Sequence, residues 1–233
     1  MQNTALTSTY QEVAAQREFV TKVYGWMSVA LAITAITAMV TASSPSILNA
    51  IVASRGVFIG LLLGELALVM ALSWAIGRIS AAAATAMFVL YSALNGLTLS
   101  FIFLVYTQAS VASTFFITAG TFGALCLYGH VTKRDLTSVG NLCFMALIGL
   151  ILASLVNMFF QNEMIYWLTT YAGILIFVGL TAYDAQKINL MSYGILGQSG
   201  QAVQKVAVLG ALALYLDFIN LFLLLLRLFG RRR

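Results

Sequence analysis

The sequence predicts an all-α integral membrane protein with seven transmembrane helices. Of its 233 residues, 61% are hydrophobic and only 8% are charged, whereas a soluble domain carries about 25% charged residues to cover its surface. The apolar residues form successive runs of about 20 residues, the length that a spanning helix needs. Strict alternation of apolar and polar residues is absent, which argues against an outer-membrane barrel.

The apolar runs predict one transmembrane domain over residues 19–229. We expect the polar residues 1–18 to be a short cytoplasmic segment, because they lack the basic start of a signal peptide and no convincing cleavage site follows. A basic tail, residues 230–233, follows the domain. The predicted spans are residues 19–41, 57–76, 81–106, 111–128, 142–160, 164–183 and 206–229.

Polar or turn-forming residues separate these runs. The first run ends at a Ser-Ser-Pro-Ser segment that contains the single proline, Pro45, and the second is bounded by Arg55 and Arg78. Proline and charged residues are expected at the ends of spans rather than inside them. The later separators are residues 107–110, 130–141, 161–163 and 185–204.

Lysine and arginine gather at alternate ends of the runs, and this sets the orientation. Cytoplasmic loops are the ones enriched in basic residues, so the N-terminus is predicted in the cytoplasm, with only Arg55 in the opposite loops. Seven crossings then place the C-terminal arginines on the far side, unless the final segment does not fully cross. The net charge of +5 therefore indicates a lipid bilayer, and no nucleic acid, as the partner. The basic residues predicted to face the cytoplasm are Arg17, Lys22, Arg78, Lys133, Arg134, Lys187 and Lys205.

Two aspartates stand out because almost everything around them is apolar. Asp184 closes the sixth run and Asp217 lies inside the seventh, in a chain with only seven acidic residues. A carboxylate at hydrocarbon depth must be protonated, paired or hydrated, so both are candidates for a functional site. If they meet, they share one proton and form a clasp that opens when both ionise. The alternative is that each bonds independently to a neighbouring helix.

Other polar residues also fall in predicted spans. Glu65 is a candidate to line an ion path, and Arg78 is a candidate latch for a freed carboxylate. Asparagines in spans usually bond across helices, so they are expected in a polar network or as structural contacts. The three asparagines are Asn95, Asn157 and Asn220.

Enzymatic chemistry is not predicted. The chain has one histidine and two cysteines without metal-ligand spacing, and it has neither a phosphate-binding loop nor a nucleophile motif. Intramembrane proteases with two catalytic aspartates carry two sequence motifs, and only one of them is found here. Tyr183-Asp184 is present, but Asp217 lacks the Gly-x-Gly-Asp context. We therefore expect no enzyme and no cofactor.

The chain resembles the Bax inhibitor-1 family, in its bacterial YccA-like branch, over most of its length. Two segments with aspartates are the most specific, TAYDAQKI at Thr181–Ile188 and LYLDFINLFLLLLRLFG at Leu214–Gly230. The segments TKRDLTSVGN at Thr132–Asn141 and NGLTLS at Asn95–Ser100, with Glu65, are also similar to family positions.

This resemblance implies a seven-helix fold in which the last helix is central and is wrapped by the other six. It implies that Asp184 and Asp217 form the family's pH-sensing pair, and that the protein lies in the bacterial inner membrane. The family's latch arginine belongs to the second span. Its expected position here is near Ile76, so Arg78 departs from the pattern.

Two functions are expected from the residues and the resemblance together. The first is a pH-sensitive calcium leak channel gated by the aspartate pair, with calcium bound transiently by Asp184 and Asp217 as a transported ion. The alternative is a membrane-embedded modulator that restrains a membrane quality-control protease or another stress-response partner. The buried acids favour the leak, whereas the lack of a traceable polar path through the outer halves of the spans favours the modulator.

Overall fold

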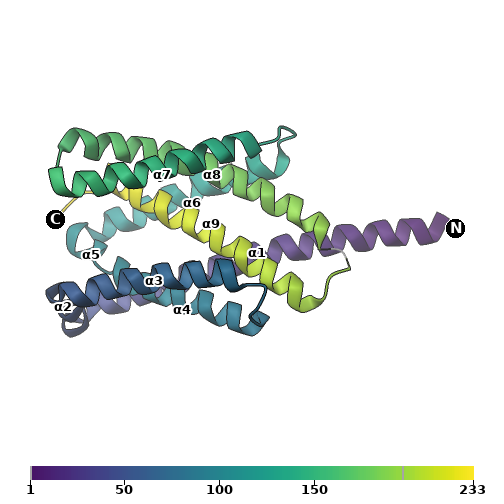
Figure 1. Cartoon of the computed structure of the whole chain (residues 1–233), viewed down its shortest axis with the longest axis horizontal. Coiled ribbons are helices and arrows are strands. Elements are labelled where there is room, and N and C mark those ends of the chain that lie inside the picture. Colours follow the sequence, from purple (N-terminus) through teal and green to yellow (C-terminus); the bar gives the residue numbers. More distant parts are fainter. Residues whose placement is uncertain (1, 196) are drawn as a thin grey trace. The chain divides into compact units, whose positions relative to one another are not determined.

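A computed structural model describes residues 2–195 and 197–233, with side chains for all of these except residues 2–11, 49, 52 and 55. Every regular element of the described chain is a helix (Figure 1). Within the described residues, seven helical segments are long and apolar enough to cross a membrane, so the predicted fold class is confirmed. The helices are α1 (Gln2–Ser43), α2 (Pro45–Ala53), α3 (Arg55–Ala75), α4 (Ala81–Leu99), α5 (Ile102–Val105), α6 (Gln108–Val131), α7 (Thr137–Phe160), α8 (Glu163–Gly194) and α9 (Gly200–Phe229).

Short polar side chains begin several of these helices. The hydroxyl of Ser80 accepts a hydrogen bond from the backbone N–H of Ala83 at 3.1 Å, and Thr107 caps α6 in the same way at 3.3 Å. These bonds satisfy backbone donors that have no partner within the first turn. Pro45 occupies the first turn of α2, where its missing N–H is not needed.

The C-terminal end of α8 differs from the prediction. Residues 185–194 were expected in a polar connection, but they continue the helix, and only residues 195–199 separate α8 from α9. Ala185, Ile188 and Ser192 are almost fully buried, while Lys187 and Tyr193 are exposed. This segment is therefore an amphipathic helix, because its buried residues recur at the helical period and form one face that packs against the protein. The loop was predicted wrongly because only the polar residues of the segment were considered.

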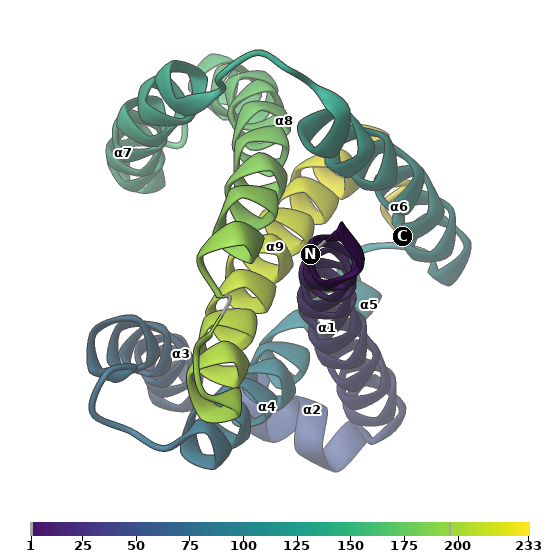
Figure 2. The same cartoon turned by 90° about the vertical axis from the view of Figure 1, so that its right-hand side faces the viewer.

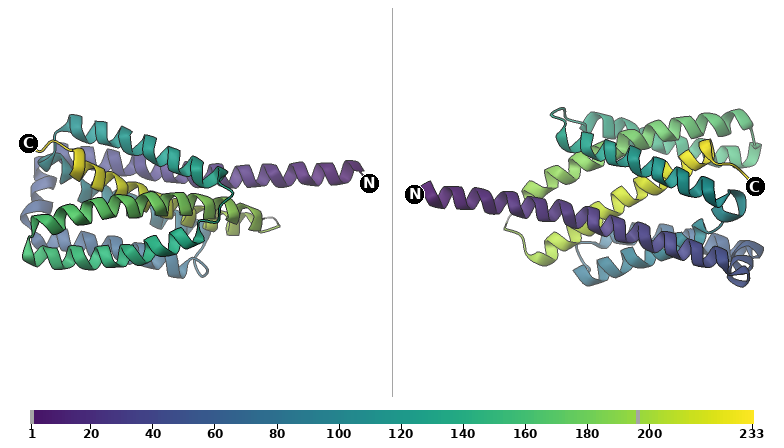
Figure 3. Two further views of the ribbon diagram at one scale, coloured as in Figure 1. Left: turned by 90° about the horizontal axis from the view of Figure 1, so that it is seen from above. Right: turned by 180° about the vertical axis from the view of Figure 1, so that it is seen from behind.

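The chain divides into two compact units, with α8 and α9 each contributing to both. The first unit runs up to Val105 and includes Met191–Tyr215. In it, α4 packs against α1 and α3, and α2 contacts both α1 and α3. The N-terminal part of α1 extends beyond the other helices of this unit (Figures 1 and 3), so the helix begins well before the predicted start of the first span at residue 19.

The first unit is centred on close packing between α1 and α4. Gly96 lies so near α1 that an added Cβ would be 2.7 Å from the carbonyl oxygen of Thr34. Tyr215 of α9 is fully buried in this unit and packs edge-on against Phe88 and Tyr91 of α4, with ring centroids 5.8 and 5.7 Å apart. A glycine at position 96 therefore permits the approach that brings α1 to this core.

The second unit consists of Tyr106–Leu190 and Leu216–Arg233. Its helices α7 and α8 lie side by side (Figures 1 and 2). Five buried side chains of α8 and α9 form its apolar core, and side chains of α6 and α7 pack against them. The core residues are Ile176, Phe177, Leu180, Leu221 and Leu225.

Burial differs sharply between the candidate spans. In α9, 67% of the most apolar window is buried, whereas none of the α7 window is. Large apolar side chains of α7, such as Leu142 and Phe160, are instead exposed, as expected for a helix that faces lipid. The high burial of α9 is compatible with the implied central helix, and that arrangement stays a prediction.

Glycine packing in the second unit generates a prediction. A Cβ at Gly129 of α6 would overlap the carbonyl oxygen of Ala182 in α8, whereas a Cβ at Gly123 of the same helix would meet nothing within 4 Å. Overpacking typically costs about 1–3 kcal/mol. We therefore expect Gly129→Ala to lower the thermal unfolding midpoint in detergent and Gly123→Ala to leave it unchanged. Equal midpoints for the two variants would contradict this packing.

Candidate functional site

The structure brings the two predicted aspartates together. Asp184 comes from α8 and Asp217 from α9, both within the second unit. Their carboxyl side chains are hydrogen-bonded to each other. The contact that sequence spacing alone left open is therefore present in the fold.

A hydrogen bond between two carboxyl groups requires a proton. An ionised carboxylate only accepts hydrogen bonds, whereas a protonated carboxyl group also donates one. A direct hydrogen bond between Asp184 and Asp217 therefore needs a proton on one of the two groups. Because the two groups interact directly, protons are gained and lost by the pair and not by either residue independently.

The two members of the pair have different surroundings. Asp217 is only 5% exposed, and its buried Oδ2 atom has no hydrogen-bond partner among the described residues. Asp184 is half-buried and lies within electrostatic reach of the Lys187 ammonium group. On α9, the neighbouring Phe218 packs against Phe122 of α6 at 5.4 Å between ring centroids. One acid is therefore sealed in protein, and the other borders a cation.

Close helix contacts fix the segment that carries Asp184. Gly129 of α6 lies against Ala182 and Ala185 of α8, and Gly140 of α7 lies against the ring of Tyr183. Side chains larger than hydrogen would not fit at either glycine without movement. The turn of α8 around Asp184 is thus held from both sides by small residues.

Gln186 adds a polar contact that the sequence did not single out. Its side-chain oxygen accepts a hydrogen bond from the backbone N–H of Leu136, and its amide nitrogen donates to the carbonyl oxygen of Arg134, both at 2.8 Å. These bonds tie the loop between α6 and α7 to α8, two residues beyond Asp184. The backbone groups that bond to Gln186 lie about 50 positions away along the chain. In the sequence, only the closeness of Gln186 to Asp184 indicated that it could belong to the site.

Asp135 in the same loop behaves differently from the pair. Hydrogen bonds from the Thr137 side chain and backbone lower the pKa of the fully exposed Asp135 carboxyl group. The backbone bond, from the Thr137 N–H to Oδ1, measures 2.9 Å. A lowered pKa keeps this acid ionised as the pH falls toward the ordinary range of aspartate, which makes it a useful control for the buried pair.

A second polar group lies in the first unit around Glu65 of α3. Glu65 is 8% exposed and accepts hydrogen bonds from the side chains of Asn95, at 3.1 Å, and of Thr98, both on α4. The structure thus joins two of the predicted polar residues, Glu65 and Asn95. Thr98 was not predicted, although it lies three residues after Asn95 on the same helix face.

The network continues from Asn95 to α9 and α1. The Tyr215 hydroxyl donates to the Asn95 side-chain oxygen at 3.1 Å and is 2.7 Å from the Thr34 hydroxyl. The single Thr34 proton is shared between two acceptors, the Tyr215 oxygen and the carbonyl oxygen of Ser92 at 2.8 Å. Four helices therefore share one buried hydrogen-bond chain. Tyr215 was missed because a tyrosine in an apolar run is most simply an apolar core residue.

The other predicted site residues lie elsewhere. Asn157 accepts a hydrogen bond from the Asn162 N–H at 2.8 Å and so supports the turn after α7. Asn220 donates to the Leu216 carbonyl oxygen of its own helix at 2.8 Å. Arg78 is exposed in the turn between α3 and α4, in the first unit, and forms no ion pair with any described residue. Its latch role stays a prediction.

Comparisons with known proteins identify relatives over nearly the whole chain. The family model described as "Inhibitor of apoptosis-promoting Bax1" matches residues 16–233. The inner membrane protein YbhL of Escherichia coli strain K12 is 52% identical over 226 residues, 97% of each chain. An uncharacterized protein of Borreliella burgdorferi is 46% identical over 228 residues, 98% of each chain. An uncharacterized protein of Rickettsia prowazekii is 40% identical over 230 residues, 99% of this chain and 95% of the relative.

These matches agree with the seven candidate spans and with the segments in which the sequence resembles known proteins. The chain is a multi-pass inner-membrane protein that belongs to the Bax inhibitor-1 family.

Proposed function

We propose that this protein is a pH-sensitive calcium leak channel whose gate is the pair formed by Asp184 and Asp217. The observation that carries the proposal is the hydrogen bond between two carboxyl groups contributed by different helices, with Asp217 buried. An intramembrane acid pair is a typical element of an ion or proton pathway. In this proposal the N-terminus is cytoplasmic, and Asp184 lies toward the cytoplasmic end of α8.

The pair would keep the ion path closed while its two carboxyl groups share a proton. The path would open when both groups ionise. The remaining charge is better placed on Asp184, since Lys187 lies nearby and the Oδ2 atom of Asp217 has no partner among the described residues. Two full charges about 4 Å apart repel by about 4 kcal/mol at an effective dielectric constant of about 20. That repulsion is enough to shift an equilibrium between two helix arrangements by up to about a thousandfold.

Calcium is the transported ion in this proposal. Ca²⁺ prefers carboxylate and other oxygen ligands and takes about six to eight of them. The pair offers two carboxyl groups, and no three His, Cys, Asp or Glu side chains gather into a metal site in the part of the chain that the structure describes. An ion held by so few protein ligands keeps much of its water, which suits transient passage and not tight storage.

The buried Glu65 network supports a polar path in the first unit. Glu65 is an acid inside a candidate span, and Asn95, Thr98, Tyr215 and Thr34 extend its hydrogen bonding across helices. Fully bonded networks of this kind are stable in low dielectric surroundings. The same groups can exchange partners with water or an ion when the helices move apart.

The gate predicts a specific effect of Asp217→Asn. An asparagine at this position can donate to an ionised Asp184 without a bound proton, so the clasp should stay closed at every pH. In liposomes that contain purified protein, we expect the calcium flux of the wild type to rise with pH. At the highest pH measured, the calcium flux of Asp217→Asn should be about tenfold lower than that of the wild type. This difference is smaller than the largest shift that the charge repulsion could cause.

Asp135→Asn is the matched control for that measurement. It removes one acid near the same loop, and its side-chain oxygen can still accept from Thr137. The control should keep the wild-type flux and pH dependence. Wild-type flux no greater than that of empty liposomes, or a pH dependence unchanged in Asp217→Asn, would refute the gate.

The second candidate function is a membrane partner that restrains a quality-control protease or another stress-response complex. The observation that favours it is the N-terminal part of α1, which extends beyond the other helices of the first unit (Figure 3). Among its described side chains, the exposed Glu18 pairs with the half-buried Lys22 at 3.8 Å, and no acid or base there is fully buried. A free polar helix of this kind suits a docking role.

A truncation separates the two functions. If α1 docks a partner, deleting residues 2–11 should remove most of the membrane protease recovered with the affinity-purified protein, while calcium flux in liposomes is unchanged. Mass spectrometry of the purified material measures the recovery. Equal recovery from full-length and truncated protein would exclude this docking role.

A further inference from the structure

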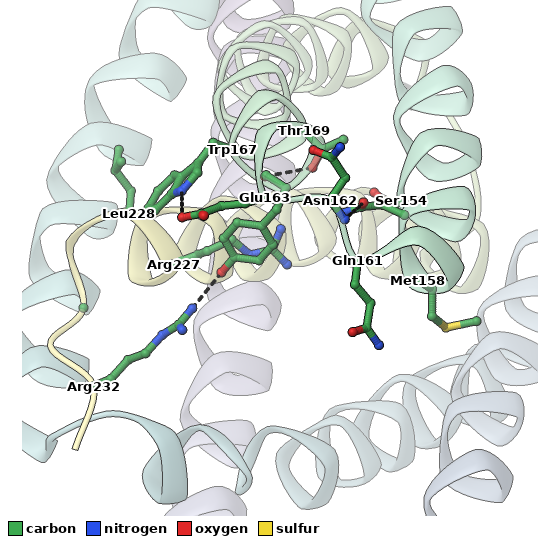
Figure 4. Close-up of a pocket in the computed structure, with 13 residues that line it drawn as sticks. Ser154, Met158, Gln161, Asn162, Glu163, Trp167, Thr169, Arg227, Leu228 and Arg232 are labelled. Carbon is green, nitrogen blue, oxygen red and sulfur yellow. Dashed lines mark hydrogen bonds between the residues drawn. The ribbon is translucent and has the colours of Figure 1, made fainter.

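A pocket with several polar lining residues lies in the second unit, at the ends of three candidate spans and apart from the aspartate pair. It has a volume of about 680 Å³, and its lining includes side chains after α7, at the start of α8, at the end of α9 and in the tail (Figure 4). The spans Thr137–Phe160 and Gly200–Phe229 end beside it, and Glu163–Gly194 begins there. The pocket is therefore at the level where a span leaves the hydrocarbon core.

Two arginines line this pocket around one tyrosine. The Arg227 guanidinium group lies over the ring of Tyr166, 4.8 Å from its centroid, and donates to the Thr170 hydroxyl at 3.4 Å. Arg232 donates to the Tyr166 hydroxyl at 3.0 Å. A guanidinium group carries five donors, so each arginine retains donors for a further acceptor.

The position of Arg232 is held by the backbone of the tail. The N–H of Arg231 donates to the Ser110 hydroxyl at 3.0 Å, and the N–H of Thr107 donates to the Arg231 carbonyl oxygen at 3.1 Å. Figure 4 shows the Arg232 side chain reaching from the tail toward the pocket that Arg227, Glu163 and Trp167 line. The tail is thus positioned against the start of α6, and its arginine belongs to a built pocket.

Positive charge exceeds negative charge in the pocket. Glu163 is its single acid among the described lining residues, and one Glu163 carboxylate oxygen accepts from the Trp167 indole N–H at 3.5 Å. Neither Arg227 nor Arg232 forms an ion pair with a described residue. Two guanidinium groups against one carboxylate favour an anion, and the planar guanidinium fork matches the oxygen atoms of phosphate.

The surroundings identify the source of that phosphate. Phe160 is 75% exposed and Met164 is 79% exposed, and each adjoins a pocket-lining residue in the sequence, so acyl chains could lie against them. Trp167 also stacks on Tyr171, and such aromatic residues gather at the membrane–water interface. We propose that this pocket binds the phosphate group of an anionic phospholipid, with Arg227 and Arg232 as its ligands.

Lipid titration of the full-length protein tests this site. Phosphatidylglycerol is added to protein in a neutral detergent, and the rise in the thermal unfolding midpoint gives an apparent dissociation constant. Arg232→Gln should weaken binding about tenfold, since it removes a charge-assisted hydrogen bond. Glu163→Gln should tighten binding by a few-fold, because it removes the opposing charge. A damaged fold would not produce that gain.

Arg233→Gln is the matched control, because Arg233 is in the same exposed tail but does not line the pocket. It should bind phosphatidylglycerol as the wild type does. Equal weakening in Arg232→Gln and Arg233→Gln would overturn the site in favour of general charge attraction. If inorganic phosphate at the same concentration raised the unfolding midpoint equally, the ligand would be a soluble anion and the proposed lipid would be wrong.

Discussion

The second unit has to accommodate a hydrogen bond between two carboxyl groups, those of Asp184 and Asp217. Two carboxyl groups cannot bond without a proton, and an ionised carboxylate inside an apolar bundle is costly unless it is paired. In the structure, Asp217 is buried and Asp184 is half-buried near Lys187. In the proposed gate, the packing of α8 and α9 is therefore coupled to the protonation of the pair.

Several contacts of the second unit surround the turn of α8 that carries Asp184. Glycines at positions 129 and 140 let α6 and α7 approach the turn around Asp184, and Gln186 ties the intervening loop to α8. Helix α9 supplies Asp217 to the second unit and Tyr215, two residues earlier, to the network in the first. The same highly buried helix thus contributes a central polar group to each unit.

Sequence reasoning predicted the seven spans and singled out the two aspartates that the structure brings together, since long apolar runs and isolated acids are local signals. It also named Glu65 and Asn95, which the structure joins by a hydrogen bond. It did not predict the helical end of α8, because the buried face of residues 185–194 is visible only once its neighbours are known. Partners such as Gln186 and Tyr215 escaped for the same reason, since their bonds join residues far apart in the chain.

The most direct test of the account is whether the pair holds a proton when the exposed acids have lost theirs. Infrared difference spectroscopy of the reconstituted protein detects the carbonyl band of a protonated carboxyl group as the pH is raised. The account predicts one such band in the wild type, which disappears over the same pH range in which calcium flux begins and is missing in Asp217→Asn. A wild-type spectrum with no protonated carboxyl group while the flux is still low would contradict the proton-held clasp.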